Sequence, residues 1–418
     1  MNSGSKVAVI GAGIAGIMAS YLLQKKFQVE LFESESKLGG HTNTQSLYIE
    51  GRKFAVDTGF IVFNERNYPL FTRFLSELKV PTRNSEMSFS YEDRASGFCY
   101  AGTSLNGLFA NRKSLVSLRF WRLLFETLRF GRLGSHFLQK ERNASTSLDE
   151  FLRLNRLSED FQRSYLLPIS AAIWSTPTEK MLAYPAYSFL SFMENHGLVR
   201  LVNRPQWKTV LGGSHEYIKK FEKVFKGRII LESPVRSIKR LPNQVEIKTD
   251  HSSRHFDFVV LAVHADQVLP LLLDPSPEEQ SAFSSWAYSK NKTLLHDDVR
   301  CMPLNRRAWA SWNYLQNDAG QLCASYHMNR LQGIASQKQF FVTLNPQSRI
   351  PNERVFYEKT YEHPTYTQSA LETQDLIRKF PKNRRTFFVG SYLGNGFHED
   401  AVRSSVQLAD QMGIPWPL

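Results

Sequence analysis

The start of the chain alternates apolar runs of strand length with a helical pattern. Residues 7–10 read VAVI, a run too short for a helix and rich in β-branched side chains, which indicates a strand buried on both faces. A helix is expected over residues 14–24, and residues 28–32 form a second strand-like run. This order of strand, helix and strand predicts a Rossmann-like α/β unit.

Strand patterns return in the middle and at the end of the chain. Residues 228–231, 245–248, 258–263 and 386–389 have the length and apolar content of strands. Residues 87–100 and 288–343 instead alternate apolar and polar positions, with aromatic side chains gathered on one face. These alternating strands predict a second sheet, which lies under an apolar cavity.

Glycines in a G-x-G-x-x-G spacing separate the first strand from the helix. In this motif the first glycine allows a tight turn, the second lets backbone N–H groups approach a pyrophosphate, and the third lets the helix pack closely. The helix dipole points at the phosphates, and an acid after the second strand can accept hydrogen bonds from ribose hydroxyls. The candidate nucleotide-binding residues are Gly11, Gly13, Ile14, Ala15, Gly16, Glu33 and Ser34.

Composition limits the class of protein. The 418 residues are 42% hydrophobic and include 30 Phe, which allows two or three domains with a large core. No apolar run has membrane-spanning length, and the motif begins too early to leave room for a signal peptide, so we expect a cytoplasmic protein. The three cysteines, Cys99, Cys301 and Cys323, lack disulfide-framework or metal-ligand spacing, and we expect no metal.

The formal net charge of +13 favours anionic partners such as a carboxylate substrate, an anionic membrane surface or nucleic acid. No nucleic-acid-binding motif accompanies the charge, so we expect no nucleic acid partner. The stretch that begins at Asn111 and ends at Arg142 is the most basic, and large apolar residues separate its Lys and Arg residues. Such a segment is typical of a helix on a membrane surface, or of an ordinary helix with a solvated charged face, and both interpretations stay open.

Two segments after the acidic strand end resemble the flavin-containing amine oxidase superfamily. Residues 37–42 read KLGGHT, and residues 56–60 read VDTGF. In that superfamily the glycine pair packs on the phosphates and ribose of FAD, and many members have Arg where this chain has His41. The resemblance implies FAD contacts for Gly39, Gly40, His41, Thr42, Thr58, Gly59 and Phe60.

The resemblance continues to the C-terminus. It implies that Val235 holds the adenine through its backbone, and that a glycine loop in residues 390–398 lies against the isoalloxazine ring. His264 is interpreted either as a donor near the cofactor or as a structural histidine, and Lys292 as the match to the lysine near flavin N5. The remaining FAD-contact candidates are Gly390, Asn395, Gly396, Phe397 and His398. The resemblance also implies that Glu399 and Asp400, which open the following helix, meet ribityl or phosphate-side groups of the cofactor.

Motifs along nearly the whole chain, including AAIWSTP, WASWNYL and GNGFHEDAV, are similar to a bacterial family of FAD-dependent oxidoreductases associated with fatty-acid modification. The resemblance implies one FAD-binding domain built from residues 1–80, 205–275 and 376–418. It also implies an α+β substrate domain made from two inserts, residues 81–204 and 276–375. Because one dinucleotide fingerprint is present, we expect no tightly bound NAD(P)H.

From this resemblance we expect non-covalent FAD to take a hydride from an apolar, fatty-acyl substrate of a membrane lipid. Three alternatives stay open: an amine oxidase, a redox-neutral fatty-acid double-bond isomerase, and a non-catalytic FAD protein at the inner face of the membrane. His196 or His398 is expected to accept a proton, and Trp312 and Tyr392 to form cavity walls. Trp174 and Asn395 are also expected near the ring.

Overall fold

The computed structural model describes residues 3–140, 146–174, 181–195, 205–317, 322–346 and 348–416. One of its two large sheets has five strands, and every pair of neighbouring strands in it is parallel. The strand order is β10 (Arg228–Ile230), β2 (Gln28–Phe32), β1 (Lys6–Ile10), β14 (Phe258–Leu261) and β20 (Thr386–Phe388). The predicted Rossmann-like α/β fold is therefore confirmed.

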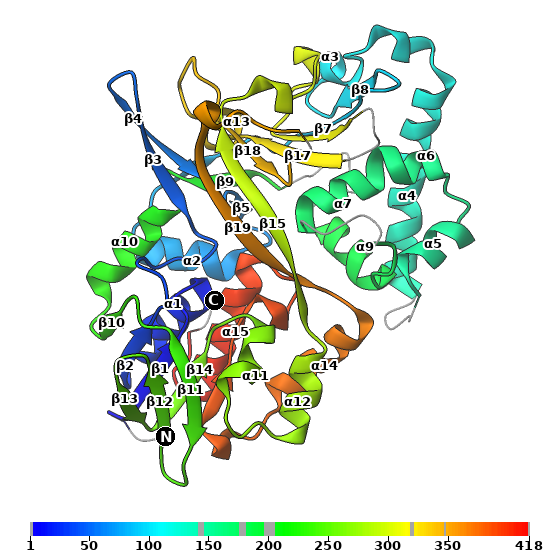
Figure 1. Cartoon of the computed structure of the whole chain (residues 1–418). Coiled ribbons are helices and arrows are strands. Elements are labelled where there is room, and N and C mark those ends of the chain that lie inside the picture. The colour runs from blue at the N-terminus through cyan, green and yellow to red at the C-terminus, as the bar shows by residue number, and fades with distance from the viewer. Residues whose placement is uncertain are drawn as a thin grey trace.

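Helices α1 (Ile14–Leu23) and α15 (His398–Gln411) pack together beside this sheet (Figure 1). Val7, Val9 and Val260 are fully buried because parallel strands are covered on both faces. An antiparallel sheet of β11 (Val235–Arg240), β12 (Val245–Thr249) and β13 (Ser253–Phe256) adjoins it.

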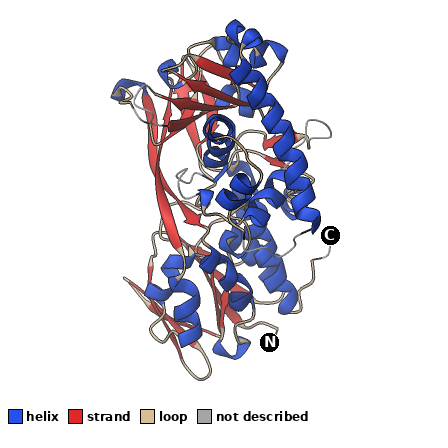
Figure 2. Ribbon diagram, turned by 90° about the vertical axis from the view of Figure 1, so that its right-hand side faces the viewer, coloured by secondary structure: helices blue, strands red, loops and turns tan. Residues whose placement is uncertain are grey.

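A seven-stranded mixed sheet forms the other large layer of the molecule. Its order is β19 (Val355–Thr365), β15 (Ala287–His296), β18 (Phe341–Leu344), β17 (Leu322–His327), β16 (Trp312–Gln316), β7 (Phe89–Asp93) and β8 (Phe98–Ala101). The long pair β15 and β19 runs from this sheet towards the five-stranded sheet (Figures 1 and 2). The sheet draws its strands from two separate stretches of chain, as the alternating patterns predicted.

Helices flank one end of the seven-stranded sheet (Figure 1). They are α3 (Leu105–Leu108), α4 (Leu118–Lys140), α5 (Leu148–Leu154), α6 (Glu159–Phe161), α7 (Leu167–Trp174) and α9 (Ala186–Asn195), with the 3-10 turn η1 (Arg112–Val116) and the π-helix η2 (Gln162–Leu166). No helix in the described ranges is long and apolar enough to cross a membrane.

The other elements are short or lie at the edges of these layers. The remaining strands are β3 (Thr44–Ile49), β4 (Arg52–Asp57), β5 (Phe63–Asn64), β6 (Thr82–Asn84) and β9 (Trp207–Val210). The remaining helices are α2 (Pro69–Glu77), α10 (His215–Val224), α11 (Val268–Leu271), α12 (Pro277–Ser284), α13 (Met328–Gln332) and α14 (Gln368–Arg378). The exact domain boundaries given above stay a prediction.

Candidate functional site

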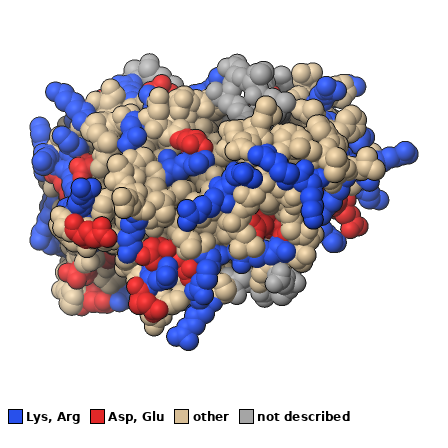
Figure 3. All heavy atoms as spheres, turned by 90° about the horizontal axis from the view of Figure 1, so that it is seen from above, with Lys and Arg blue, Asp and Glu red and all other residues tan. Residues whose placement is uncertain are grey.

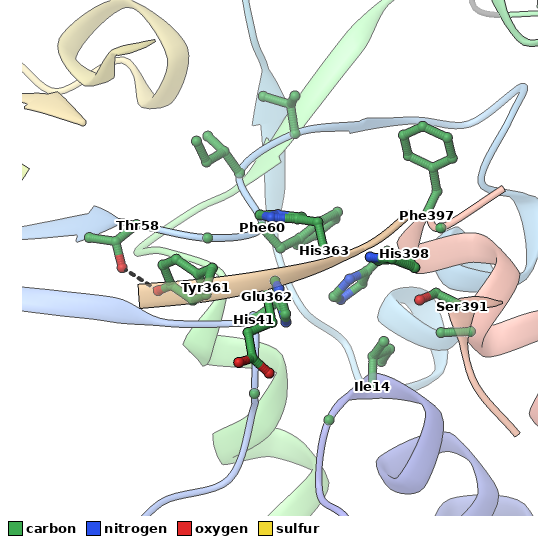
Figure 4. Close-up of a pocket in the computed structure, with 18 of the residues that line it drawn as sticks. Ile14, His41, Thr58, Phe60, Tyr361, Glu362, His363, Ser391, Phe397 and His398 are labelled. Atoms are coloured by element: carbon green, nitrogen blue, oxygen red, sulfur yellow. Dashed lines mark hydrogen bonds between the residues drawn. The ribbon is translucent and has the colours of Figure 1, made fainter. Parts of the chain in front are cut away.

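A large cavity joins the loops of the five-stranded sheet to the seven-stranded sheet. Its volume is about 970 Å³, at the upper end of the range for ligand pockets. One end is lined by the turns that follow β1 and β2, and the other by residues of β7, β16 and β17. Figure 4 shows that segments far apart in the sequence supply its wall.

The glycine turn after β1 opens a space beside the start of α1. Gly13 is the N-cap residue of α1, and a Cβ at this position would meet no atom within 4 Å. No side chain caps the helix, so its first backbone N–H groups are suited to an anion. Gly16 differs, because a Cβ there would lie 1.8 Å from the carbonyl oxygen of Gly11. Gly16 therefore serves helix packing.

Gly39 and Gly40 close this space from the second turn. The N–H of Gly39 donates to the carbonyl of Ala12 at 2.9 Å, and a Cβ on Gly40 would lie 3.3 Å from the Cα of Gly13. Gly40 also has a φ of +57°, which favours glycine. The two turns thus form a backbone-lined slot with the shape and donors that a pyrophosphate requires.

Glu33 is fixed on the wall of this slot. Its carboxylate accepts the N–H of Ala12 at 2.8 Å and the N–H of Glu35 at 2.9 Å. Glu33 and Ser34 both line the cavity, directly after β2. This is the place where the motif predicts an acid for ribose hydroxyls, and that role stays a prediction.

Histidines from distant segments meet beside the slot. The ring of His41 lies 5.3 Å from that of His363 and 6.0 Å from that of His264, centroid to centroid. Burial lowers the pKa of His41 well below its usual value and that of His363 to about 4, so both rings are neutral at pH 7. His264 lies 3.5 Å from a carboxylate oxygen of Glu362. The sequence interpretation missed His363 and Glu362.

Polar contacts hold the segment around Thr58 against β19. The hydroxyls of Thr58 and Tyr361 are 2.8 Å apart (Figure 4), and the amide of Asn43 donates to both. A Cβ on Gly59 would lie 2.0 Å from the carbonyl oxygen of His41, so this position requires glycine. Thr58 and Gly59 line the cavity, as does the unpredicted Tyr361.

The loop between β20 and α15, with the first residue of α15, supplies a further wall, which includes Gly390, Gly396, Phe397 and His398. The ring of His398 stacks on Phe60 with centroids 3.7 Å apart, and its Nε2 lies 3.1 Å from the hydroxyl of Tyr217. Burial lowers the pKa of His398 to about 3, so it binds a proton weakly at neutral pH. These contacts favour a wall role for His398, and its role as proton acceptor stays a prediction.

The end of the cavity towards the seven-stranded sheet is apolar and rich in aromatic side chains. Phe192 stacks on Phe397 with centroids 4.5 Å apart. Tyr165 comes from the π-helix η2, a form of helix that is frequent at functional sites. The apolar and aromatic lining residues at this end are Met87, Phe89, Tyr100, Tyr165, Ile169, Phe192, Trp312, Tyr326 and Leu344.

Two buried donors on the cavity lining fit a bound molecule. Trp312 Nε1 and the Tyr392 hydroxyl have no hydrogen-bond partner among the described residues. Together with the glycine slot and Glu33, they form a set that fits FAD, and the backbone N–H groups of the glycine turns would hold its pyrophosphate. When bound, FAD supplies a hydride acceptor, and the chain supplies orientation and exclusion of water.

Several predicted site residues lie elsewhere. Gly16, Thr42, Val235 and Asn395 are not among the lining residues. Thr42 is buried, with its hydroxyl 2.5 Å from that of Tyr217. Val235 begins β11. His196 and the side chain of Trp174 lie outside the described part of the chain.

Three further expectations need correction. Lys292 is half exposed on β15 and pairs with Glu358 at 2.9 Å, so it does not line the cavity. The acids that open α15 were expected to meet the cofactor, but Glu399 accepts the N–H groups of Leu70 and Phe71. Asp400 accepts backbone N–H groups of its own loop. Both acids therefore position the wall.

Comparisons with known proteins identify the family and the fold of the chain. A family model described as flavin containing amine oxidoreductase matches residues 14–315. The fold is similar to that of a CLA-producing fatty acid isomerase from P. acnes, with a TM-score of 0.70 and 17% identity over 97% of this chain and 98% of that chain. It is also similar to a cyclohexylamine oxidase from Brevibacterium oxydans, with a TM-score of 0.69 and 14% identity over 98% of this chain and 100% of that chain.

A putrescine oxidase bound to putrescine has a TM-score of 0.70 and 13% identity, over 98% of this chain and 99% of that chain. Among curated proteins, none matches the chain. At these identities the solved structures show the fold, while the family model covers most of the sequence. The chain belongs to the flavin-containing amine oxidoreductase family, and it is an FAD-dependent oxidoreductase.

Proposed function

We propose that this enzyme removes a hydride from the acyl chain of a lipid and leaves a carbon–carbon double bond. The observation that carries the proposal is the apolar, aromatic end of the cavity, which includes Phe89, Ile169 and Phe192. Such a wall offers an acyl chain dispersion contacts and a dry environment, at about 0.8 kcal/mol for each buried CH₂ group. The carbon next to the one that gives up the hydride loses a proton. His398 and His196 stay the candidates for the group that accepts this proton.

The carboxylates that line the cavity already have partners in the protein, and this disfavours a cationic amine as the substrate. Those among the described lining residues are Glu33, Glu35, Glu86 and Glu362. Three of them form ion pairs, Glu35 with Lys359, Glu86 with Arg330 and Glu362 with Lys290. Glu33 accepts backbone N–H groups at the nucleotide end. A protonated amine would have to compete with these partners, whereas an acyl chain needs none.

A second candidate is redox-neutral double-bond isomerisation. The specific support is the similarity in fold to the fatty acid isomerase from P. acnes, which extends over 97% of this chain. In that reaction the hydride returns to the chain at another carbon, so no external acceptor is consumed. The same apolar wall would hold the substrate.

The absorbance of the purified flavoprotein without oxygen tests the substrate class. We expect lipids with unsaturated, methyl-branched or cyclopropane acyl chains, dispersed in detergent, to bleach the band of oxidised flavin. Putrescine and cyclohexylamine form the parallel series. Bleaching by an amine, with none by any lipid, would overturn the proposal.

Trp312→Phe tests the apolar end directly. The change removes an N–H that has no protein partner among the described residues and shortens one wall of the cavity. We expect the free energy of unfolding to fall by no more than about 1.5 kcal/mol. The lipid concentration for half-maximal bleaching should rise by about fivefold to tenfold, because the smaller ring buries less of the acyl chain. An unchanged value would show that Trp312 does not contact the substrate.

A further inference from the structure

We propose that one face of the molecule, formed by α3, η1 and the first half of α4, docks on an anionic lipid bilayer. We name it the α4 face and define it by Leu105, Leu115, Val116, Leu118, Trp121, Phe125 and Leu128. The inference deepens the proposed function and rests on it in one respect, because an acyl chain held in a bilayer has to reach the cavity.

Exposed apolar side chains are concentrated on this face. The described residues leave sixteen large apolar side chains exposed, and seven of them lie between Leu105 and Leu128. Leu118 is 89% exposed, Val116 87% and Phe125 63%. Single exposed apolar residues are ordinary, but a contiguous group marks an interaction site.

The periodicity of α4 explains why these residues point outward. Its buried side carries Phe120, Leu123 and Phe130, which pack against the protein. Leu118, Trp121, Phe125 and Leu128 follow each other at intervals of three or four residues on the other side. A helix that packs on one side is expected to be polar on its outer side, and here that side carries an apolar stripe for three turns.

Basic side chains surround the apolar stripe. Between Leu105 and Arg132 the sequence has six Lys or Arg residues and one acid, Glu126, which is 5% exposed and bonds to Ser158. The exposed basic residues of this segment are Arg112, Lys113, Arg122 and Arg132, and of these Arg122 also pairs with Glu126 at 3.3 Å. Arg119 is excluded from this group because Asp160 holds it in a bidentate pair.

The loop that contains Leu304 adds further exposed apolar and basic side chains next to the α4 face. Leu304 is 78% exposed, and Arg306 and Arg307 are exposed beside it. The side-chain amide of Asn305 donates to the carbonyl of Ala110 at 2.7 Å, which holds this loop next to α3. Figure 3, seen from above the end with α3, shows many Lys and Arg side chains and fewer Asp and Glu side chains on a largely uncharged surface. Apolar side chains with a basic surround match the interface of an anionic bilayer.

The α4 face lies close to the apolar end of the cavity. Phe120, on the buried side of α4, has its ring 6.4 Å from that of Tyr100, which lines the cavity. The hydroxyl of Tyr100 donates to the carbonyl of Ser164, and Arg119 donates to the hydroxyl of the same serine. One helix therefore separates the proposed bilayer contact from the cavity wall.

Co-sedimentation of the flavin-loaded protein with vesicles tests the proposal. We expect binding to vesicles of phosphatidylglycerol and phosphatidylethanolamine, weaker binding at high salt, and little binding to phosphatidylcholine. Trp121→Ser with Phe125→Ser, and separately Lys113→Glu with Arg132→Glu, should each lower the partition coefficient by about tenfold or more. Matched controls on distant strands, Tyr48→Ser and Lys248→Glu, should bind as the parent protein does.

The outcomes separate this proposal from the proposed function. Trp121→Ser with Phe125→Ser should keep the bleaching by lipid in detergent, because neither residue lines the cavity. Vesicle binding without bleaching by any lipid would overturn the substrate and leave the docking surface in place. Equal binding to neutral and anionic vesicles, or unchanged binding of both double variants, would overturn the docking surface. A concentration-dependent dimer that the same variants dissociate, with no vesicle binding, would assign the face to a second copy of the chain instead.

Discussion

Gly13→Val should give a folded protein that contains no FAD. The position has open space around a Cβ and a φ of −68°, so valine is compatible with the backbone. Its side chain would project into the slot between the two glycine turns, where the pyrophosphate approaches the start of α1. We expect at least a hundredfold loss of FAD affinity, about 3 kcal/mol or more. The ratio of flavin absorbance to protein absorbance after purification measures how much FAD the variant retains.

Gly16→Val in the same motif is the matched contrast. A Cβ at residue 16 would lie 1.8 Å from the carbonyl oxygen of Gly11, so α1 could not pack against β1. We expect this variant to be insoluble or unfolded by circular dichroism, whereas Gly13→Val keeps the helical signal. A Gly13→Val protein that purifies with a full complement of flavin would contradict the placement of the pyrophosphate.

Low pH should destabilise the protein, because its buried histidines bind protons less readily in the folded state than in the unfolded chain. The contribution of one of them, His296, can be measured separately. Its Nε2 lies 2.7 Å from the hydroxyl of Thr343 and its Nδ1 accepts the N–H of Asp298, while burial lowers its pKa to about 4. The folded state therefore binds fewer protons than the unfolded chain between pH 6.5 and 4. The contribution to stability is complete above pH 6.5 and is lost as the pH falls, on the order of 2–3 kcal/mol.

A comparison with the His296→Gln variant separates the contribution of His296 from that of buried acids, whose protonation changes the stability in the opposite direction. Burial raises the pKa of Asp57 to about 6 and of Glu399 to about 7, so protonation of these acids favours the folded state as the pH falls. The free energy of unfolding should be measured by urea titration of both proteins at pH 7 and pH 4. We expect the parent to lose more stability than His296→Gln over this range. Equal losses would show that His296 is protonated in the folded protein.

The parts of the fold with local signals were predictable. β1, α1 and β2 follow from the apolar runs and the glycine spacing, and β20 from its short apolar run. β19 was missed because it reads VFYEKTYEHPT, whose charged residues and proline obscure the strand pattern. Its stability comes from pairing with β15 along most of its length, a long-range property.

Site residues that are brought together by long-range strand pairing could not be predicted from the local sequence either. His363, Glu362 and Tyr361 reach the cavity because β19 crosses it, so their approach to His41 depends on sheet register. Register also explains Lys292, which alternates with the buried Asn291 and Thr293 and therefore faces outward. The glycine slot, by contrast, depends on residues close in sequence.

The most direct measurement of the central claim is the mass of the acyl chains after a single anaerobic turnover. Stoichiometric oxidised flavoprotein is mixed with the lipid that bleaches it, and the chains are then analysed by mass spectrometry. We predict chains that have lost two hydrogen atoms for each flavin reduced, one as a hydride and one as a proton. Rearranged chains of unchanged mass would favour isomerisation over hydride removal. Unaltered chains, together with oxidation of an amine in the parallel reaction, would contradict the account.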